Sequence, residues 1–398
     1  MTIYIDHCGT TPLAREVRDA MIAFMGSGDE TGNFANPAAH HHAAGRCAFE
    51  AVEKARAAVA AAIHAKPEWV SFTGGASEAN NIVLHGFARK HRHGKCRILV
   101  GATEHKSVLD SALDLRDQSG CEVDILPVNK SNGSIDMEAL VAGLAKVPAG
   151  SIPTMVAIMW CNNEIPARNP VEEIAKLCAK AKAFFHCDAV QGVVREEVNV
   201  TRLAGLGLSS LVFAPHKIYG PKGVGVLVIP ERSPMLRIDA PFQGGEQEKK
   251  LRPGTLNTLG IVGTGVAVAL HSQRRAELLA HLKACDEAFI QSMSAVKGFA
   301  LTVPRTDSCP GIVNFHVDGI DAESLVHEVA NEVCANRGAS CSGAGGEKIR
   351  HVPAALGLPV EIAANVIRVS FGFANTLADA AQAARILQAA IQKMRRLP

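Results

Sequence analysis

Lys217 and Asp188 are two residues whose types and positions fit one piece of enzyme chemistry. Lys217 follows the apolar, strand-like stretch 209–213, and Asp188 ends another such stretch, 183–188. An amine and a carboxylate at two strand ends fit a pyridoxal phosphate (PLP) site, where a lysine forms an imine with the cofactor and an aspartate holds its pyridinium nitrogen. A single lysine or aspartate at a strand end is more often a solvated loop residue, so this interpretation depends on the rest of the chain.

A glycine-rich turn offers a place for a phosphate group. The expected strand 69–73 is followed by Gly74-Gly75-Ala76-Ser77 and then by a helical pattern. A helix that begins after such a turn presents free backbone N–H groups and the positive end of its dipole to an anion. The turn is neither a Walker A motif nor a dinucleotide fingerprint, so by itself it is also compatible with a plain strand–helix connection.

The elements that must position these groups alternate between about residues 50 and 230. Alternation of short β-rich runs with longer helical patterns predicts an α/β fold, with a mostly parallel seven-stranded sheet and helices on both faces. In such sheets ligands bind beyond the carboxyl ends of the strands, where the polar groups of this chain fall. The seven expected strands are 69–73, 96–100, 123–126, 154–159, 183–188, 210–213 and 224–229.

The second half of the chain has a different pattern. A long helical pattern covers 259–295, two further expected strands lie at 311–317 and 366–371, and a final amphipathic helix covers 377–396. We therefore predict a large PLP-binding domain formed by residues 13–258, and a smaller α+β domain formed by residues 1–12 and 259–398.

Composition excludes several classes of function. The 398 residues include 41 basic and 39 acidic ones and only 5% aromatic residues, which argues against direct nucleic-acid binding. No apolar stretch reaches transmembrane length, and no signal peptide is expected. The eleven cysteines are scattered singly, which predicts reduced thiols and a cytoplasmic location. We interpret the triplet His40-His41-His42 as a loop or helix entry, and we predict no metal site.

Several motifs together resemble those of the cysteine desulfurases, within the fold-type I, class V aminotransferase-like PLP enzymes. The resemblance covers nearly the whole chain and is closest to the nitrogenase and iron–sulfur-cluster type. The matching stretches are Ile5-Asp6, Thr10-Thr11-Pro12, Asn36-Pro37, Thr103-Glu104-His105, Asn162-Asn163-Glu164, Asp188-Ala189-Val190-Gln191, His216-Lys217, Arg252-Pro253-Gly254-Thr255 and Ile367-Arg368-Val369-Ser370.

The resemblance implies roles around the cofactor ring. Lys217 would be the Schiff-base lysine, and Asp188 would hold the pyridinium nitrogen. His105 would stack on the ring and take part in catalysis. Asn163 and Gln191 would lie near the ring edge and its phenolic oxygen, and Asn163 would also contact the substrate.

The resemblance also implies residues for the phosphate and the substrate. Ser77, His216 and the backbone of Ala76 would hold the phosphate, with Thr255 reaching it from the partner subunit of a homodimer. Arg368 would bind the substrate carboxylate, a role that suits its planar, bidentate guanidinium. Ala214 departs from the family, which often has serine there, so one possible phosphate hydroxyl is missing.

The choice of reaction depends on Cys341, which lies in a Gly/Ser-rich stretch, 337–346, that resembles the mobile catalytic loop of group I desulfurases. The expected reaction converts L-cysteine to L-alanine and leaves a persulfide on Cys341 for delivery to a sulfur-acceptor protein. The alternatives are a PLP-dependent C–S or selenocysteine lyase, or a class V aminotransferase, none of which needs Cys341. A non-catalytic homologue would not be expected to keep Lys217, Asp188, His105 and Arg368 together. The sequence does not select the pathway that receives the sulfur.

Overall fold

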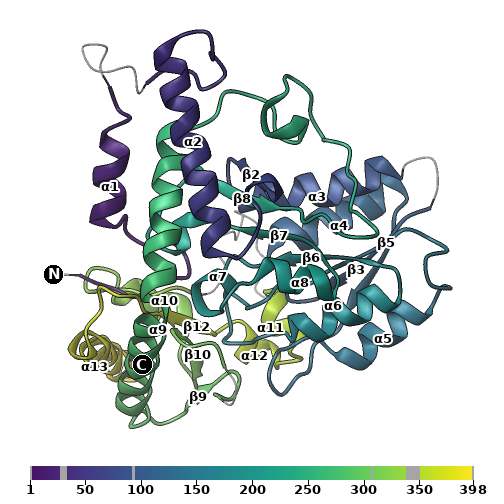
Figure 1. Ribbon diagram of the computed structural model, residues 1–398. Coiled ribbons are helices and arrows are strands. Elements are labelled where there is room, and N and C mark those ends of the chain that lie inside the picture. Colours follow the sequence, from purple (N-terminus) through teal and green to yellow (C-terminus); the bar gives the residue numbers. More distant parts are fainter. Residues whose placement is uncertain (1, 27–33, 92–94, 306–307, 338–349, 397–398) are drawn as a thin grey trace.

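A seven-stranded sheet forms the centre of the computed structural model, which describes residues 2–26, 34–91, 95–305, 308–337 and 350–396 (Figure 1). Six strands run in the same direction, and β8 alone runs in the opposite one. The predicted α/β fold with a mostly parallel sheet is confirmed. In their order across the sheet the strands are β2 (Val70–Thr73), β8 (Gly225–Val228), β7 (Leu208–Phe213), β6 (Phe184–Asp188), β5 (Thr154–Ala157), β3 (Arg97–Gly101) and β4 (Glu122–Leu126).

The middle strands are covered on both faces, as their nearly continuous apolar sequences require. In β3, Ile98 and Val100 pack in one hydrophobic cluster, whereas Leu99 packs in another on the opposite face. Helices α3 (Ala76–Lys90) and α4 (Lys106–Ser119) cover the first face (Figure 1). The second face carries α5 (Met137–Ala145), α6 (Val171–Lys180), α7 (Gly192–Arg195) and α8 (Val200–Leu206).

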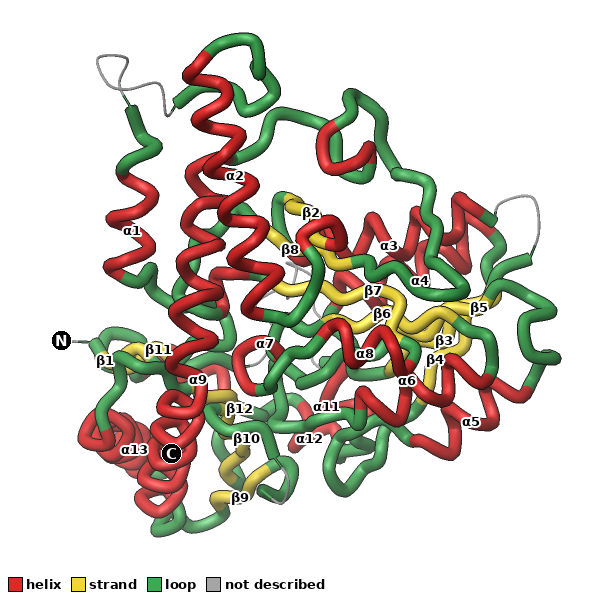
Figure 2. The backbone as a smooth tube through the Cα atoms, viewed as in Figure 1, coloured by secondary structure: helices red, strands yellow, loops and turns green. Residues whose placement is uncertain are grey.

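Three helices stand side by side next to this sheet (Figure 2). The long helix α9 (Thr258–Met293) packs against α1 (Arg15–Ile22) and α2 (Ala43–Ala62). Small residues allow the close approach, since a Cβ on Gly265 would lie 2.8 Å from the Cα of Ala55. The helix expected at 259–295 is thus present almost as predicted.

A smaller sheet lies at the far end of α9. Its three antiparallel strands are, in order, β12 (Ile367–Ser370), β10 (Ile312–Val317) and β9 (Phe299–Leu301). The N-terminal strand β1 (Ile3–Tyr4) pairs with β11 (Val333–Cys334), so the first residues join the C-terminal half of the chain. The division into domains at 12/13 and 258/259 stays a prediction. The helices of this region are α10 (Ala322–Glu328), α11 (His351–Ala355), α12 (Val360–Ala363) and α13 (Leu377–Met394).

The observed elements differ from the expected ones in a few short strands. The short strands β1, β9 and β11 were not expected, because two or three residues carry no detectable periodicity. The histidine triplet is a helix entry as predicted, since the Nδ1 of His42 accepts a hydrogen bond from the N–H of Gly45 at 2.9 Å. None of the described helices is long and apolar enough to cross a membrane.

Candidate active site

The carboxyl ends of β2, β3, β5, β6 and β7 meet at one edge of the sheet, because these strands share one direction. A cavity of about 600 Å³, called the strand-end cavity below, lies at this edge. Of the predicted site residues, Thr255 does not line it, and Cys341 lies outside the described residues. The predicted residues that do line it are Ala76, Ser77, His105, Asn163, Asp188, Gln191, His216, Lys217 and Arg368.

Lys217 projects into this cavity from a short 3-10 helix, η2 (Pro215–Lys217), that follows β7. Its Nζ donates hydrogen bonds of 2.6 Å to the carbonyl oxygens of Cys8 and Gly9. Burial lowers the pKa of Lys217 from 10.5 to about 8. About a tenth of such a lysine is neutral at pH 7. Lys217 is therefore suited to act as a nucleophile and as a base.

The N-terminal segment fixes the turn that carries this lysine. The N–H and Oγ1 of Thr11 both donate to the carbonyl oxygen of His216 at 2.9 Å, and the N–H of Tyr219 donates to the same Oγ1. The Nδ1 of His216 lies 3.1 Å from the Oγ1 of Thr10. These contacts explain why the Thr10-Thr11 motif accompanies the His216-Lys217 motif.

Asp188 ends β6 and is held by hydrogen bonds to both of its carboxylate oxygens. The backbone N–H of Val190 donates to Oδ1 and the Nδ2 of Asn80 donates to Oδ2, each at 2.9 Å. Asn80 is fully buried, and its Oδ1 lies 3.0 Å from the Nε2 of His186. Burial lowers the pKa of His186 to about 3, so its imidazole is neutral and donates this bond. The orientation of the carboxylate is therefore fixed by buried groups behind the cavity.

His105 joins the same hydrogen-bond network from the segment after β3, which lies two strands away from β6 in the sheet. It caps α4, because its Nδ1 accepts from the N–H of Ser107 at 3.1 Å. The Oγ of Ser107 lies 2.8 Å from this Nδ1 and accepts from the Nδ2 of Asn80 at 2.9 Å. Burial lowers the pKa of His105, so the ring is neutral, and its acceptor Nδ1 assigns the ring proton to Nε2.

The glycine-rich turn has the geometry of an anion site. Helix α3 begins at Ala76 with no side chain capping its first N–H groups. A Cβ on Gly75 would meet no atom within 4 Å, so open space lies beside these groups. Strand β8 passes close behind, where a Cβ on Gly225 would lie 2.3 Å from the carbonyl carbon of Gly75. Only glycine fits at that second position.

Arg368 lies in β12 and reaches the cavity although its side chain is only 2% exposed. Its Nη2 pairs with the Oδ1 of Asp6 at 2.5 Å, and its Nη1 donates to the carbonyl oxygen of Asn163 at 2.8 Å. A guanidinium has five N–H donors, so these two bonds leave donors for a further anion.

Gln191 is oriented by a buried arginine. Its Oε1 accepts from the Nη1 of Arg195 at 2.6 Å, and its Nε2 donates to the carbonyl oxygen of Cys8 at 3.3 Å. The side-chain amide is therefore held in one orientation at the cavity wall.

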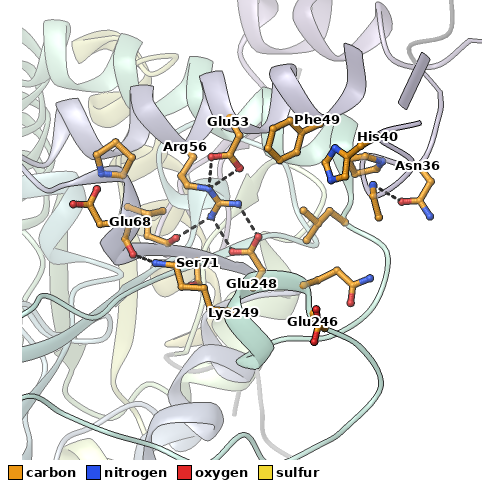
Figure 3. A pocket seen from close by; sticks show the side chains of 16 residues that line it. Asn36, His40, Phe49, Glu53, Arg56, Glu68, Ser71, Glu246, Glu248 and Lys249 are labelled. Atoms are coloured by element: carbon orange, nitrogen blue, oxygen red, sulfur yellow. Dashed lines mark hydrogen bonds and ion pairs between the residues drawn. The ribbon is translucent and has the colours of Figure 1, made fainter. Parts of the chain in front are cut away.

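A second cavity, of about 710 Å³, lies beside the beginning of β2, where Val70 and Ser71 line it (Figure 3). Arg56 crosses it and forms a two-fold ion pair with Glu248, at 2.7 and 2.9 Å, which also accepts from the N–H of Phe72. Leu256 and the half-exposed Phe49 line it as well. Arg56 also pairs with Glu53, so the central charges of this cavity neutralise one another. The described residues that line it include no buried lysine opposite a fixed aspartate, in contrast to the strand-end cavity.

A comparison with protein families decides the assignment. The family model described as "Aminotransferase class-V" matches residues 3–382. The chain belongs to this family. It is similar to cysteine desulfurase IscS of Neisseria meningitidis serogroup C, with 34% identity over 99% of this chain and 93% of the relative. It is also similar to the probable mitochondrial cysteine desulfurase of Schizosaccharomyces pombe, with 35% identity over 95% of this chain and 72% of the relative.

Solved structures agree with this assignment. A NifS-like protein superposes with a TM-score of 0.87 at 27% identity, covering all of both chains. SspA in complex with cysteine superposes with a TM-score of 0.77 at 27% identity, covering 93% of this chain and 99% of that one. The sequence-based assignment to the cysteine desulfurases, with the fold-type I architecture, is confirmed.

Enzymes of this family depend on PLP, and the strand-end cavity fits that cofactor. It offers an amine at Lys217, a fixed carboxylate at Asp188, a neutral imidazole at His105 and an uncapped helix end at Ala76. These groups match the aldehyde, the pyridine nitrogen, the ring face and the phosphate in turn.

Sequence reasoning missed several residues of this site. Cys8 and Gly9 hold Lys217, although the neighbouring Thr10-Thr11 motif pointed to this segment. Cys161 and Lys222 line the cavity but carry no motif of their own. Asn80 lies about one helical turn after the glycine-rich turn. This spacing places its side chain near the cavity only if the direction of the helix is already known.

Proposed function

We propose that this chain is a PLP-dependent desulfurase that converts L-cysteine to L-alanine and transfers the sulfur to Cys341. The arrangement of Lys217 and Asp188 in the wall of one cavity, beside an uncapped helix end, supports this proposal most directly. The curated relatives support the same reaction class.

Lys217 would attach the cofactor covalently and later move a proton at the substrate Cα. When bound, PLP supplies an electron sink for bond cleavage next to the substrate amino group. The lowered pKa of Lys217 keeps a reactive share of the amine neutral near neutral pH. Asp188, held on both oxygens, would keep the ring nitrogen protonated and the ring in place.

His105 and Arg368 would orient the reactants. A neutral His105 with its proton on Nε2 offers a flat face for the ring and one N–H donor toward the cavity. Arg368 would bind the substrate carboxylate with the donors that Asp6 and Asn163 leave free. Asn163 and Gln191 would contact the ring edge, and Ser77, His216 and the Ala76 N–H would hold the phosphate.

The thiolate of Cys341 would accept the sulfur. The Cys341 thiolate would form an S–S bond with the substrate sulfur while the C–S bond breaks. The electron pair of the C–S bond would stay with the carbon skeleton, which takes up a proton and leaves as alanine, and Cys341 would carry the sulfur as a persulfide. A lyase or an aminotransferase would omit this transfer. A sulfur-acceptor protein would then receive the persulfide sulfur.

We also propose a symmetric dimer that completes each site. Thr255 is exposed and does not line the cavity of its own chain, which fits a residue offered to a partner subunit. The next residue, Leu256, lines the second cavity together with the half-exposed Phe49, so that a partner surface would cover apolar groups there. The ion pair of Arg56 and Glu248 anchors the loop that leads to Thr255 (Figure 3).

A cytoplasmic location completes the proposal. None of the ten described cysteines forms a disulfide, which fits a reducing compartment.

Covalent attachment of the cofactor tests the assignment of Lys217. After loading with PLP and reduction with borohydride, peptide mapping should find the cofactor on Lys217, and Lys217→Ala should attach none and turn over no L-cysteine. Lys222→Ala is the matched control, because Lys222 lines the same cavity from an exposed position and should leave the attachment intact. Attachment at another lysine would contradict the proposal.

A further inference from the structure

Two cysteines and a glutamate form a cluster beside the strand-end cavity. Cys161 follows β5, Glu196 directly follows α7, and Cys309 precedes β10. The Sγ atoms of Cys161 and Cys309 and a carboxylate oxygen of Glu196 all lie within 4.8 Å of one another. The Cys161 Sγ lies 3.9 Å from the Glu196 Oε1. Three segments that are far apart in sequence thus bring three potential metal ligands together.

The donor set and its spacing match a tetrahedral site for a zinc-type cation. Zinc binds cysteine sulfur at about 2.3 Å and carboxylate oxygen at about 2.0–2.2 Å, so neighbouring ligand atoms of a tetrahedron lie roughly 3.5–3.8 Å apart. The cluster needs only shifts of about an ångström or less to reach this spacing, given its 4.8 Å limit. Two sulfurs and one oxygen favour zinc-type cations over magnesium or calcium.

The ligands are held from behind in the way that metal ligands usually are. The Nε of Arg168 pairs with the Oε1 of Glu196 at 2.8 Å, and the Arg168 backbone forms a β-bridge with Cys161. The N–H of Cys309 donates to the carbonyl oxygen of Pro166 at 2.8 Å. Supporting contacts of this kind orient the ligands of known metal sites.

The three residues of the cluster differ in their exposure to solvent. Cys161 is 1% exposed and Cys309 is fully buried, whereas the Glu196 side chain is 17% exposed. A cation could therefore enter past Glu196 and be enclosed by the two sulfurs. Cys161 also lines the strand-end cavity, so the cluster borders the active site without containing the residues proposed for PLP.

Two arginines lie beside the cluster, and one of them, Arg168, already pairs with Glu196 at 2.8 Å and contacts Cys309. Arg195 is buried beside these thiols and Cys8, and within the described residues it pairs with no carboxylate inside 4 Å. A divalent cation that replaces the protons of two thiols leaves the net charge of the cluster unchanged.

We propose that Cys161, Cys309 and Glu196 bind one zinc-type divalent cation, with the fourth coordination position left for a small exogenous ligand. This site stands apart from the proposed desulfurase chemistry, since it depends only on the geometry of these three residues.

Cobalt binding tests the proposal, because tetrahedral cobalt bound by thiolates absorbs red light, where bound PLP does not interfere. The protein would be the reduced, PLP-loaded full chain carrying Cys341→Ser, which removes the cysteine of the Gly/Ser-rich stretch as a competing ligand. Titration with Co²⁺ should reach one equivalent with this absorption, and Zn²⁺ should displace it. Elemental analysis of the zinc-treated protein should give the same stoichiometry.

Ligand variants locate the metal. Cys309→Ser and Cys161→Ser should each weaken cobalt binding by more than the roughly 10–100-fold expected when a residue that only orients a ligand is lost. Glu196→Gln should also weaken it, and this nearly isosteric, partly exposed change serves if a cysteine variant folds poorly. Cys178→Ser, a buried thiol on α6 outside the cluster, should leave binding unchanged.

Two results would overturn the proposal. One is the absence of stoichiometric cobalt binding in the reduced protein. The other is a cobalt affinity that stays the same in Cys161→Ser, Cys309→Ser and Glu196→Gln, which would place the metal elsewhere.

Discussion

The Nδ2 of Asn80 lies 2.9 Å from the Oδ2 of Asp188 and 2.9 Å from the Oγ of Ser107, which in turn contacts the Nδ1 of His105. One buried amide thus connects the carboxylate proposed for the ring nitrogen with the imidazole proposed for the ring face. Asn80 is a positioning residue in this account, because it acts on the cofactor only through these two side chains.

Asn80→Ala should therefore lower kcat by about 10- to 100-fold, which corresponds to the roughly 1.5–3 kcal/mol of a hydrogen bond to a charged group. KM for L-cysteine should change much less, and the visible absorption of the bound cofactor should shift, since the contact of Asp188 with the ring nitrogen is loosened. Steady-state kinetics and absorption spectra measure both.

Two further variants test whether Asn80 acts by positioning Asp188 and His105 or only by stabilising the fold. Ser107→Ala cuts only the branch to His105 and should give a smaller loss of kcat. Asn81→Ala, on the neighbouring and partly exposed position of α3, should behave like wild type. Equal effects of Asn80→Ala and Asn81→Ala would show that the network does not matter.

The pKa of Lys217 predicts the pH dependence of cofactor attachment. Burial lowers this pKa from 10.5 to about 8, and only the neutral amine attacks an aldehyde. The attachment rate of cofactor-free protein should therefore rise about tenfold per pH unit below pH 8 and level off above it. Stopped-flow absorbance after mixing with PLP measures this rate. A rate that keeps rising up to pH 10 would mean that burial does not lower the pKa of Lys217.

The lowered pKa of Lys217 also predicts how the stability of the fold changes with pH. Between pH 8 and 10.5 the unfolded chain keeps the Lys217 proton longer than the folded one, so folding becomes more favourable as pH rises through this range. Cofactor-free wild type should therefore gain stability relative to Lys217→Met between these pH values, as measured by denaturant unfolding. An opposite trend in this difference would contradict the lowered pKa.

Asp188→Asn should keep the shape of the site but lose its charge. PLP should still bind, whereas kcat should fall by orders of magnitude, because the lost interaction acts on the charge that develops in the transition state. Near-normal turnover would mean that another residue holds the ring nitrogen.

The dimer prediction concerns Thr255. Mixing inactive Lys217→Ala protein with a strongly impaired Thr255 variant should restore part of the activity, because hybrid dimers contain one site with neither change. Size-exclusion chromatography should show a dimer under the same conditions. A fully active monomer at assay concentration would contradict shared sites.

The sequence predicted that the strand-end residues lie together, because parallel strands bring their carboxyl ends to one edge, whereas the roles of these residues stay predictions. The strand order alone is enough to predict that four of these residues lie together: Lys217, Asp188, His105 and Gln191. The hydrogen bonds of Asn80 could not be predicted, because they depend on the directions of side chains in α3 and β6, and residue spacing does not give these directions. The cluster of Cys161, Glu196 and Cys309 depends on the contact of the segment before β10 with the end of α7, which the scattered single cysteines of the sequence do not indicate.

The most direct test of the account follows the sulfur of L-cysteine in the wild type and in Cys341→Ser. The wild type should form L-alanine, and mass spectrometry should find one added sulfur on the peptide that carries Cys341. Cys341→Ser should still bind L-cysteine, seen as a change in the cofactor absorption, but should release no sulfide. If Cys341→Ser desulfurises L-cysteine as fast as the wild type, sulfur transfer to Cys341 is wrong and the chain works as a different PLP lyase.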